Sequence, residues 1–128
     1  ATIAPDVEYV DNGASVKQAN LIFSRFMEML IDNNGKVRSV KRYAEALCIT
    51  PKYLSFVSKS VSGKTALELI HKYTVETIVR YLKHSNLSIK EISEMLDFPN
   101  LSFFGKFTKS HLGVSPTEFR RTQSIKHK

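Results

Sequence analysis

The sequence lacks several features that would link it to a secreted, metal-dependent or membrane-spanning protein. Only one of its 128 residues is cysteine, so no internal disulfide can form. The four histidines and Cys48 do not have the spacing of a metal site, and no apolar run reaches the ~18 residues that a membrane span requires. The N-terminus also lacks the basic-then-apolar order of a secretory signal. These absences predict a cytoplasmic protein with no cofactor, no metal and no membrane contact.

Acidic charge is scarce over most of the chain. The formal net charge is +7, but residues 1–32 carry two basic and five acidic side chains, whereas the remainder carries 17 basic and seven acidic ones. Clustered positive charge attracts polyphosphates of any sequence, because each neutralised phosphate releases condensed counterions. On charge alone, a basic surface without any nucleic-acid role is an equal alternative.

The N-terminal part differs in pattern from the rest. Residues 1–15 mix proline, glycine, asparagine and aspartate without helical period, which predicts a linker or frayed terminus. Apolar residues then recur at steps of three and four over residues 16–31, as in an amphipathic helix, and residues 33–35 (Asn-Asn-Gly) end it. The acidic, unpatterned beginning predicts that the domain 16–128 is the C-terminal part of a longer protein.

The remainder of the chain contains one pattern twice. SVKRYAEAL at residues 39–47 aligns with SIKEISEML at residues 88–96. After a one-residue insertion at the turn, KSxxGxTxxE at residues 59–68 aligns with KSxxGxSxxE at residues 109–118. A solenoid needs about three or more units, and this chain has only two copies. The pattern therefore predicts one supersecondary unit used twice.

Each copy contains, in order, the sequence signals of a helix, a tight turn, a second helix and a glycine that ends it. Three capping boxes begin helices, formed by Thr65 with Glu68, Ser88 with Glu91, and Ser115 with Glu118. Gly63 and Gly113 stand where a helix needs a left-handed residue to end. Two short helices joined by about three or four residues form a helix-turn-helix, whose second helix enters the major groove of DNA.

The predicted fold is therefore all-α, with about seven helices. The two helix-turn-helix subdomains cover about residues 36–63 and 88–121, with helices at 40–47, 52–61, 89–96 and 101–112. A long connecting helix covers about residues 65–84. It would be about 30 Å long, close to the roughly 34 Å between successive major grooves on one face of the duplex. One monomer could therefore bind two adjacent grooves.

Helical period separates core from DNA-facing positions on the first recognition helix. The predicted buried stripe is Leu54, Val57 and Val61, and the opposite side carries Lys52, Ser55, Phe56 and Lys59. Phe56 suits a thymine methyl, and Lys52 can donate to guanine O6 or N7. Packing of Phe56 against a neighbouring domain is the alternative.

On the second recognition helix the same period directs Phe104 and Phe107 inward. Its outward positions are Ser102, Gly105, Lys106 and Lys109, and Phe103 is predicted to have a structural role. The expected phosphate contacts are Lys41, Lys59, Lys90 and Lys109, which would set the register without reading sequence. For any one of these lysines, an ordinary solvated surface position is an equal alternative.

A known family shows a similar C-terminal pattern. The matching positions are Ile92-x-x-Met95-Leu96-Asp97-Phe98-Pro99-Asn100-x-Ser102-x-Phe104-x-Lys106-x-x-Lys109-x-x-x-Gly113-Val114-Ser115-Pro116-x-x-Phe119-Arg120. This segment resembles the signature of the AraC/XylS family of bacterial transcription regulators, and the resemblance extends over about residues 36–121. It implies two helix-turn-helix subdomains in adjacent major grooves of a promoter, with double-stranded DNA and RNA polymerase as partners and activation as the usual outcome.

The resemblance also implies which residues contact bases. Family base-reading positions correspond to Lys52, Ser55 and Phe56 in the first motif and to Leu101, Ser102 and Lys106 in the second. A separate N-terminal domain, absent from this chain, often senses a ligand and dimerises in the family. A regulator of this kind would be associated with the nucleoid.

Three residues depart from the family pattern in the second motif. The family usually has glycine where Asp97 stands, a small residue where Ser93 stands, and an aromatic where Thr108 stands. Aspartate tolerates a left-handed turn conformation better than most residues, so Asp97 could still adopt it. Thr108 weakens the core unless Phe107 compensates. These departures affect the predicted geometry of the second recognition helix more than its existence.

Other classes of function find less support in the sequence. Cys48 lies between apolar Leu47 and Ile49 and is predicted to be a buried structural thiol, and the histidines have no acidic partner at a suitable spacing, so we expect no enzyme. The alternatives are an architectural protein that binds DNA only through charge and a helical protein-interaction module. The polar faces around Lys52 and Ser102 favour a sequence-specific regulator instead.

Overall fold

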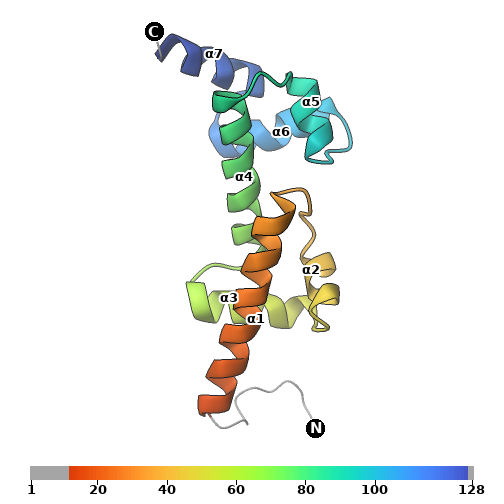
Figure 1. Ribbon diagram of the computed structural model, residues 1–128, viewed down its shortest axis with the longest axis vertical. Helices are drawn as coiled ribbons and strands as arrows, with labels where there is room; N and C mark the ends of the chain where they lie inside the picture. The colour runs from red at the N-terminus through yellow and green to blue at the C-terminus, as the bar shows by residue number, and fades with distance from the viewer. Residues whose placement is uncertain (1–11, 127–128) are drawn as a thin grey trace. The chain divides into compact units, whose positions relative to one another are not determined.

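The computed structural model describes residues 12–126, and the side chains of residues 16–123. Every regular element in this range is an α-helix (Figure 1). In chain order the helices are α1 (Asn12–Asn33), α2 (Val40–Ala46), α3 (Pro51–Ser62), α4 (Ala66–His84), α5 (Ile89–Met95), α6 (Leu101–Leu112) and α7 (Pro116–Lys126). Over the described residues, the predicted all-α class with seven helices is confirmed. No helix in this part of the chain is long and apolar enough to cross a membrane.

The helices form two compact units, each with its own helix-turn-helix. Unit 1 contains the described residues up to Asn33 together with Arg38–Ile70, and unit 2 contains Asn34–Val37 and the described residues from His71 onward. The boundary falls inside α4, so the first turn of α4 belongs to unit 1 and the rest to unit 2.

The core of unit 1 forms where α1 packs against α3. Ile22, Phe26 and Leu30 are buried at steps of four along α1, as expected for an amphipathic helix. The Phe26 ring meets the buried Tyr43 ring of α2 edge-on, with centroids 5.3 Å apart. Burial raises the pKa of the Tyr43 hydroxyl, which accepts a hydrogen bond of 2.7 Å from Asn33 Nδ2. The C-terminal end of α1 is thereby fixed to α2.

Helix α1 begins earlier than the sequence predicts. The predicted linker covered residues 1–15, but the helix begins at Asn12, so residues 12–15 are helical and residues 1–11 lie outside the described range. Composition is a weak guide here, because a helix whose later turns are packed extends easily by one turn. At its other end α1 stops at Asn33 as predicted, and Asn34 and Gly35 follow with φ of 58° and 86°.

The turn after α1 is bound to α4 within unit 2. The Thr74 hydroxyl donates to the Gly35 carbonyl at 3.2 Å, and Gly35 is buried against that helix. The Asn34 amide donates to the Tyr81 hydroxyl at 3.0 Å and accepts from Arg80 Nη2 at 2.8 Å. These bonds join residues 39 to 47 positions apart, and they explain why Asn34–Val37 belongs to unit 2.

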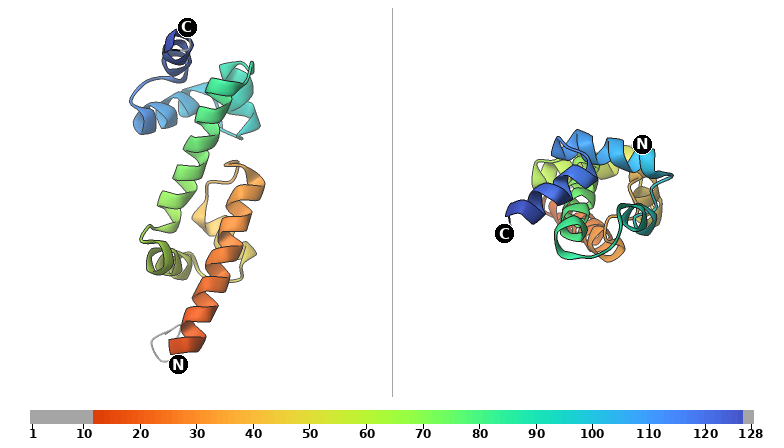
Figure 2. Two further views of the ribbon diagram at one scale, coloured as in Figure 1. Left: turned by 60° about the vertical axis from the view of Figure 1, so that its left-hand side comes forward. Right: turned by 90° about the horizontal axis from the view of Figure 1, so that it is seen from above.

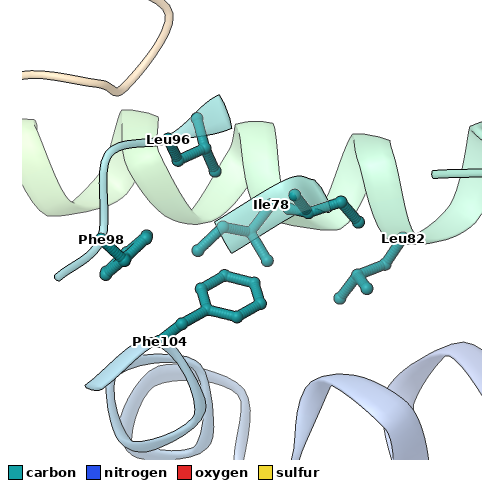
Figure 3. Close-up of a cluster of buried hydrophobic side chains, with 6 residues drawn as sticks. Ile78, Leu82, Leu96, Phe98 and Phe104 are labelled. Atoms are coloured by element: carbon teal, nitrogen blue, oxygen red, sulfur yellow. The ribbon is translucent and has the colours of Figure 1, made fainter. Parts of the chain in front are cut away.

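The core of unit 2 gathers α5, α6 and the C-terminal part of α4 (Figures 1 and 2). Its buried members are Ile78, Leu82, Ile92, Leu96, Phe98 and Phe104. Figure 3 shows the labelled side chains pointing toward one another, with Phe98 and Phe104 converging from the turn and from α6. Their ring centroids lie 5.0 Å apart, within the range of favourable aromatic pairs.

Arg120 of α7 fastens the end of α4 to the beginning of α5. Its Nη1 donates to the Leu87 carbonyl at 2.5 Å, its Nε to the Leu82 carbonyl at 3.1 Å, and its Nη2 to the Tyr81 and Ser85 carbonyls at 3.0 and 3.4 Å. The last carbonyls of a helix have no partner inside it, and a guanidinium offers five donors in a fixed fork. Arg120 therefore supplies the C-terminal cap of α4.

Candidate nucleic-acid interface

Both helix-turn-helix corners have the same backbone geometry. In unit 1, Cys48 N donates to Glu45 O at 3.1 Å and Ile49 N to Ala44 O at 3.0 Å. In unit 2, Asp97 N donates to Glu94 O at 3.1 Å and Phe98 N to Ser93 O at 3.0 Å. This pair of bonds is the Schellman helix ending, which requires a left-handed residue at the corner. Cys48 and Asp97 have φ of 60° and 57°, so the left-handed conformation predicted for Asp97 is confirmed.

The prediction of a buried thiol at Cys48 is wrong. Cys48 is exposed, although both of its neighbours are apolar. The exposed residue is the left-handed residue of the corner itself, while Leu47 and Ile49 on either side are half-buried. The apolar character of the two neighbours does not reveal that the residue between them is exposed.

The recognition helices α3 and α6 begin and end with equivalent signals. The Thr50 side chain accepts from Tyr53 N at 3.0 Å, and the Asn100 side chain accepts from Phe103 N at 2.8 Å. At the other end, Gly63 and Gly113 have φ of 81° and 85°, and the nitrogen of each donates to the carbonyl four residues back. The predicted glycine stops are confirmed, and each helix is fixed at both ends within its unit.

The outward side of α3 carries the predicted DNA-contacting residues of unit 1. Lys52, Phe56 and Lys59 are exposed and Ser55 is half-buried. On the inward side Leu54 and Val57 are fully buried, but Val61, predicted to be buried, is 40% exposed. Val61 lies in the last turn of α3, and helical period gives the side on which a residue lies but not whether a packing partner covers it.

Ser58 is buried in place of Val61. Its hydroxyl donates to the Lys64 carbonyl at 2.7 Å, which satisfies the polar group and ties the end of α3 to the loop before α4. The equivalent residue in unit 2 is Thr108, which is 1% exposed. Its Oγ1 is buried and has no hydrogen-bond partner among the described residues. The family anomaly at Thr108 is therefore a buried, unsatisfied hydroxyl.

On α6 the predicted DNA-contacting residues of unit 2 face solvent. Leu101, Ser102, Lys106 and Lys109 are exposed, and Phe104 is fully buried as predicted. Phe103 was predicted to be structural but is 54% exposed, with its ring centroid 6.4 Å from that of Phe98. The neighbouring Phe104 takes the core position, which leaves Phe103 on the surface in the first turn of α6.

The charge on these surfaces is of one sign. Neither α3 nor α6 contains an aspartate or glutamate. The four lysines predicted to contact phosphates, Lys41 on α2, Lys59 on α3, Lys90 on α5 and Lys109 on α6, are all exposed. The lysines can attract a polyanion to each recognition helix through charge. The lysine, serine and apolar side chains of the helix would then face the bound polyanion.

Two contributors were not predicted from the sequence. Arg120 stands in the quoted motif, but its contacts to four carbonyls lie 33 to 39 residues away. The sequence pattern marks Asn34 only as part of a helix stop, although its side chain is hydrogen-bonded to Tyr81 and Arg80 of α4. Pairing of this kind leaves no local periodic signal. Only an unexplained arginine after the third capping box could have drawn attention to the cap of α4.

Comparison with known proteins identifies the class. A model described as a helix-turn-helix domain matches residues 43–122. The uncharacterized transcriptional regulatory protein YesN of Bacillus subtilis is 26% identical over 106 residues, which cover 80% of this chain and 29% of that protein. The xylose operon regulatory protein of Escherichia coli K12 is 31% identical over 85 residues, which cover 66% of this chain and 22% of that protein.

Solved structures agree with this class. The C-terminal domain of AraT, a response regulator from Geobacillus stearothermophilus, superposes with a TM-score of 0.71 at 28% identity, covering 79% of this chain and 84% of that one. The DNA-binding domain of AdpA, solved in complex with a target DNA, also gives a TM-score of 0.71 and covers 80% of this chain and 93% of that one. At 16% identity, the second likeness shows the fold alone.

The molecule is thus a helix-turn-helix domain of the kind found in transcription regulators. Because the domain model matches more than half of its length, the chain belongs to the AraC/XylS-type helix-turn-helix family, as its sequence motif indicates. The chain spans between 16% and 35% of the length of the curated relatives that it matches.

Proposed function

We propose that this chain binds double-stranded DNA in a sequence-specific manner and thereby regulates transcription, with α3 and α6 in adjacent major grooves. The observation that carries the proposal is the repetition of a complete motif. In each unit a Schellman corner and two helix caps hold a recognition helix whose outward side is lysine-bearing and free of acidic residues.

The outward residues take two roles in this proposal. Lys52 and Lys106 donate to guanine O6 or N7, while Ser55 and Ser102 hydrogen-bond to base edges beside them. Lys41, Lys59, Lys90 and Lys109 contact phosphates and set the register. Two recognition helices of one monomer in adjacent major grooves require half-sites about one helical turn of DNA apart.

The names of related proteins support the regulatory part. AdpA was solved with a target DNA, and a xylose-binding transcription activator, xylR, superposes with a TM-score of 0.64 at 27% identity, covering 79% of this chain and 27% of that one. We extend activation to this chain on that basis. A contact with RNA polymerase, an attached sensor or dimerisation domain, and a cytoplasmic, nucleoid-associated location stay predictions.

The proposal is tested by selecting bound sequences from random duplex DNA with the whole chain, and then by competition at fixed salt. We expect two short conserved boxes about one helical turn apart and a preference over random duplex of roughly 10³-fold or more. Salt should weaken binding strongly in both cases, because phosphate contacts release counterions.

Two outcomes would overturn this function in different directions. Equal affinity for the selected and random duplexes would indicate an architectural protein that binds through charge alone. If the chain does not bind duplex DNA at any salt concentration, the result would indicate a protein-interaction module.

A further inference from the structure

Apart from lysine, the two recognition helices lack the charged and amide side chains that most often discriminate bases. Bidentate pairs of arginine with guanine and of asparagine or glutamine with adenine give much of the sequence readout in known complexes, and aspartate or glutamate accepts from cytosine. None of these five residue types occurs in α3 or α6. Asn100, which precedes α6, is occupied as its cap. Readout by these helices must therefore depend on lysine and serine, which can hydrogen-bond to base edges, and on apolar contacts.

Large apolar side chains stand on the same outward surfaces. On α3, Phe56 is 54% exposed and its ring lies nearly parallel to that of Tyr53, with centroids 6.3 Å apart. Lys52 and Lys59 are four and three residues away on the same face, since residues at these spacings are neighbours on a helix. An aromatic ring between two lysines is therefore presented to whatever polyanion the lysines attract.

Unit 2 presents its apolar groups in the first turn of α6. Leu101 and Phe103 are 47% and 54% exposed and flank Ser102, and Lys106 lies one turn further along. The Phe103 ring makes a tilted contact with buried Phe98, and Phe103 N donates a hydrogen bond to the Asn100 side chain. The first turn of a recognition helix is the part that enters the groove. Phe103 is thus held in place where base edges would lie.

We propose that Phe56 in unit 1 and Leu101 and Phe103 in unit 2 read thymine 5-methyl groups, so that thymine anchors each half-site. The inference rests on the proposed DNA binding and specifies its ligand chemistry. The thymine methyl is the apolar group that base pairs present in the major groove, and it is the matching partner for an aromatic or aliphatic side chain. The Phe56 ring stacks on Tyr53 and the Phe103 ring makes a tilted contact with Phe98, and these contacts limit the rotamer entropy that ordering the two rings costs.

The experiment removes only the methyl group. In the selected duplex each thymine is replaced singly by deoxyuridine, which keeps the base-pairing and hydrogen-bonding groups unchanged. We expect the affinity of the whole chain to fall by about fourfold at each contacted thymine, the effect of one buried methyl-sized group, and not to change elsewhere.

Variants assign the methyls to residues. Phe103→Ala and Leu101→Ala should each abolish the thymine-to-deoxyuridine difference at the one thymine that the replaced residue contacts in the unit 2 half-site, and both should leave the other half-site unchanged. Phe56→Ala should abolish the difference in the unit 1 half-site only. Phe103→Leu should retain part of the effect. Leu67→Ala is the matched control, because Leu67 is a similarly exposed apolar residue, 45% exposed, on α4 rather than on a recognition helix. Thermal unfolding checks that each variant is folded.

The outcome separates this inference from the proposed function. If the selection yields clear boxes but no deoxyuridine substitution changes affinity, methyl readout is wrong and sequence-specific binding stands. Methyl effects that all persist in Phe56→Ala, Leu101→Ala and Phe103→Ala would contradict the assignment to these residues. A selection that yields no boxes contradicts the proposed function itself.

Discussion

The two units share their turns and caps but differ in what lies behind the recognition helix. Corner, N-cap and glycine stop have the same hydrogen bonds in both. Ser58 in unit 1 has a satisfied buried hydroxyl, whereas the equivalent Thr108 in unit 2 has an unsatisfied one. Ile70 is fully buried in unit 1, whereas the repeat places Arg120 at the equivalent position of unit 2. The repeat therefore preserves the frame of the motif and not the chemistry of its support.

The two units therefore obtain their rigidity in different ways. Unit 1 is supported by apolar burial, from α1 and from residues such as Ile70 at the beginning of α4. Unit 2 also has long-range hydrogen bonds to α4: Arg120 binds the end of this helix, and the Asn34–Gly35 turn binds its middle. Polar support is directional and depends on every partner, so single substitutions should affect the two units unequally.

Arg120→Ala should cause the largest loss of stability. It removes a charged donor from four carbonyls, and we expect the free energy of unfolding of unit 2 to fall by about 3 kcal/mol. Amide hydrogen exchange in the whole chain should show faster exchange in α5 to α7 and little change in α2 and α3. Arg121→Ala is the control, since its exposed side chain lies 3.7 Å from Glu118 and should contribute below about 1 kcal/mol. Equal losses from the two variants would contradict the capping role of Arg120.

Gly35→Ala should cause the second-largest loss of stability. The residue has a left-handed φ of 86°, and a Cβ there would lie 3.0 Å from the Thr74 Cα, a backbone atom that cannot move alone. We expect a loss of about 2 kcal/mol in chemical denaturation, from the backbone conformation and the close contact together. Gly113→Ala shares the conformation, with φ of 85°, but has nothing within 4 Å of its Cβ, so it should lose about 1 kcal/mol. If both variants lose the same amount, the close approach to Thr74 has no energetic weight.

The pair Ser58 and Thr108 should give effects of opposite sign. Thr108→Val replaces the unsatisfied hydroxyl with a methyl of similar volume and should stabilise unit 2 by about 1 kcal/mol. Ser58→Ala removes a hydroxyl bonded to Lys64 and should destabilise unit 1 by about 1 kcal/mol. Urea denaturation of both variants measures the two signs. Destabilisation by Thr108→Val would show that its hydroxyl has a stabilising partner.

The smallest expected effect concerns the acid sensitivity of the first capping box. Thr65 N donates to the Glu68 carboxylate at 2.8 Å, and this bond holds the pKa of Glu68 below its ordinary value of 4.5. A lowered pKa adds stability above pH 4.5 that is lost as the pH falls through the folded-state pKa. Glu68→Gln should therefore lose less stability than the wild type between pH 6 and pH 3 in chemical denaturation. Glu118→Gln is the matched comparison in unit 2, where the carboxylate lies near Arg121. An unchanged acid loss in Glu68→Gln would contradict this origin.

The sequence predicted what local chemistry determines. Capping boxes and glycine stops are signals within a few residues, and they placed the helix ends within two residues of those observed from α2 to α6. The capping box at Ser88 is complete, with Glu91 N donating to Ser88 Oγ at 3.0 Å and Ser88 N to Glu91 Oε1 at 2.8 Å. At Ser115 the hydroxyl accepts from Glu118 N at 3.1 Å.

Features that depend on distant partners were mispredicted or not predicted. Cys48 was predicted to be buried from its apolar neighbours and Val61 from helical period, and both are exposed. Phe103 was predicted to be structural, and its ring is 54% exposed. The bonds of Asn34 and Arg120 connect segments more than 30 residues apart. For the same reason the choice of base-contacting residues stays a prediction, since it concerns a partner outside the chain.

The most direct test of the central claim, that each unit reads its own half-site, is to measure base preference position by position for three variants. Lys52→Ala should relax preference in one box only, and Lys106→Ala in the other box only, each with a loss of about 1–3 kcal/mol on the selected site. Lys90→Ala, a predicted phosphate contact, should weaken selected and random duplexes alike and reduce the salt slope by about one. If all three variants weaken both kinds of DNA equally, or if Lys52→Ala and Lys106→Ala relax the same box, the account of two separate recognition helices is contradicted.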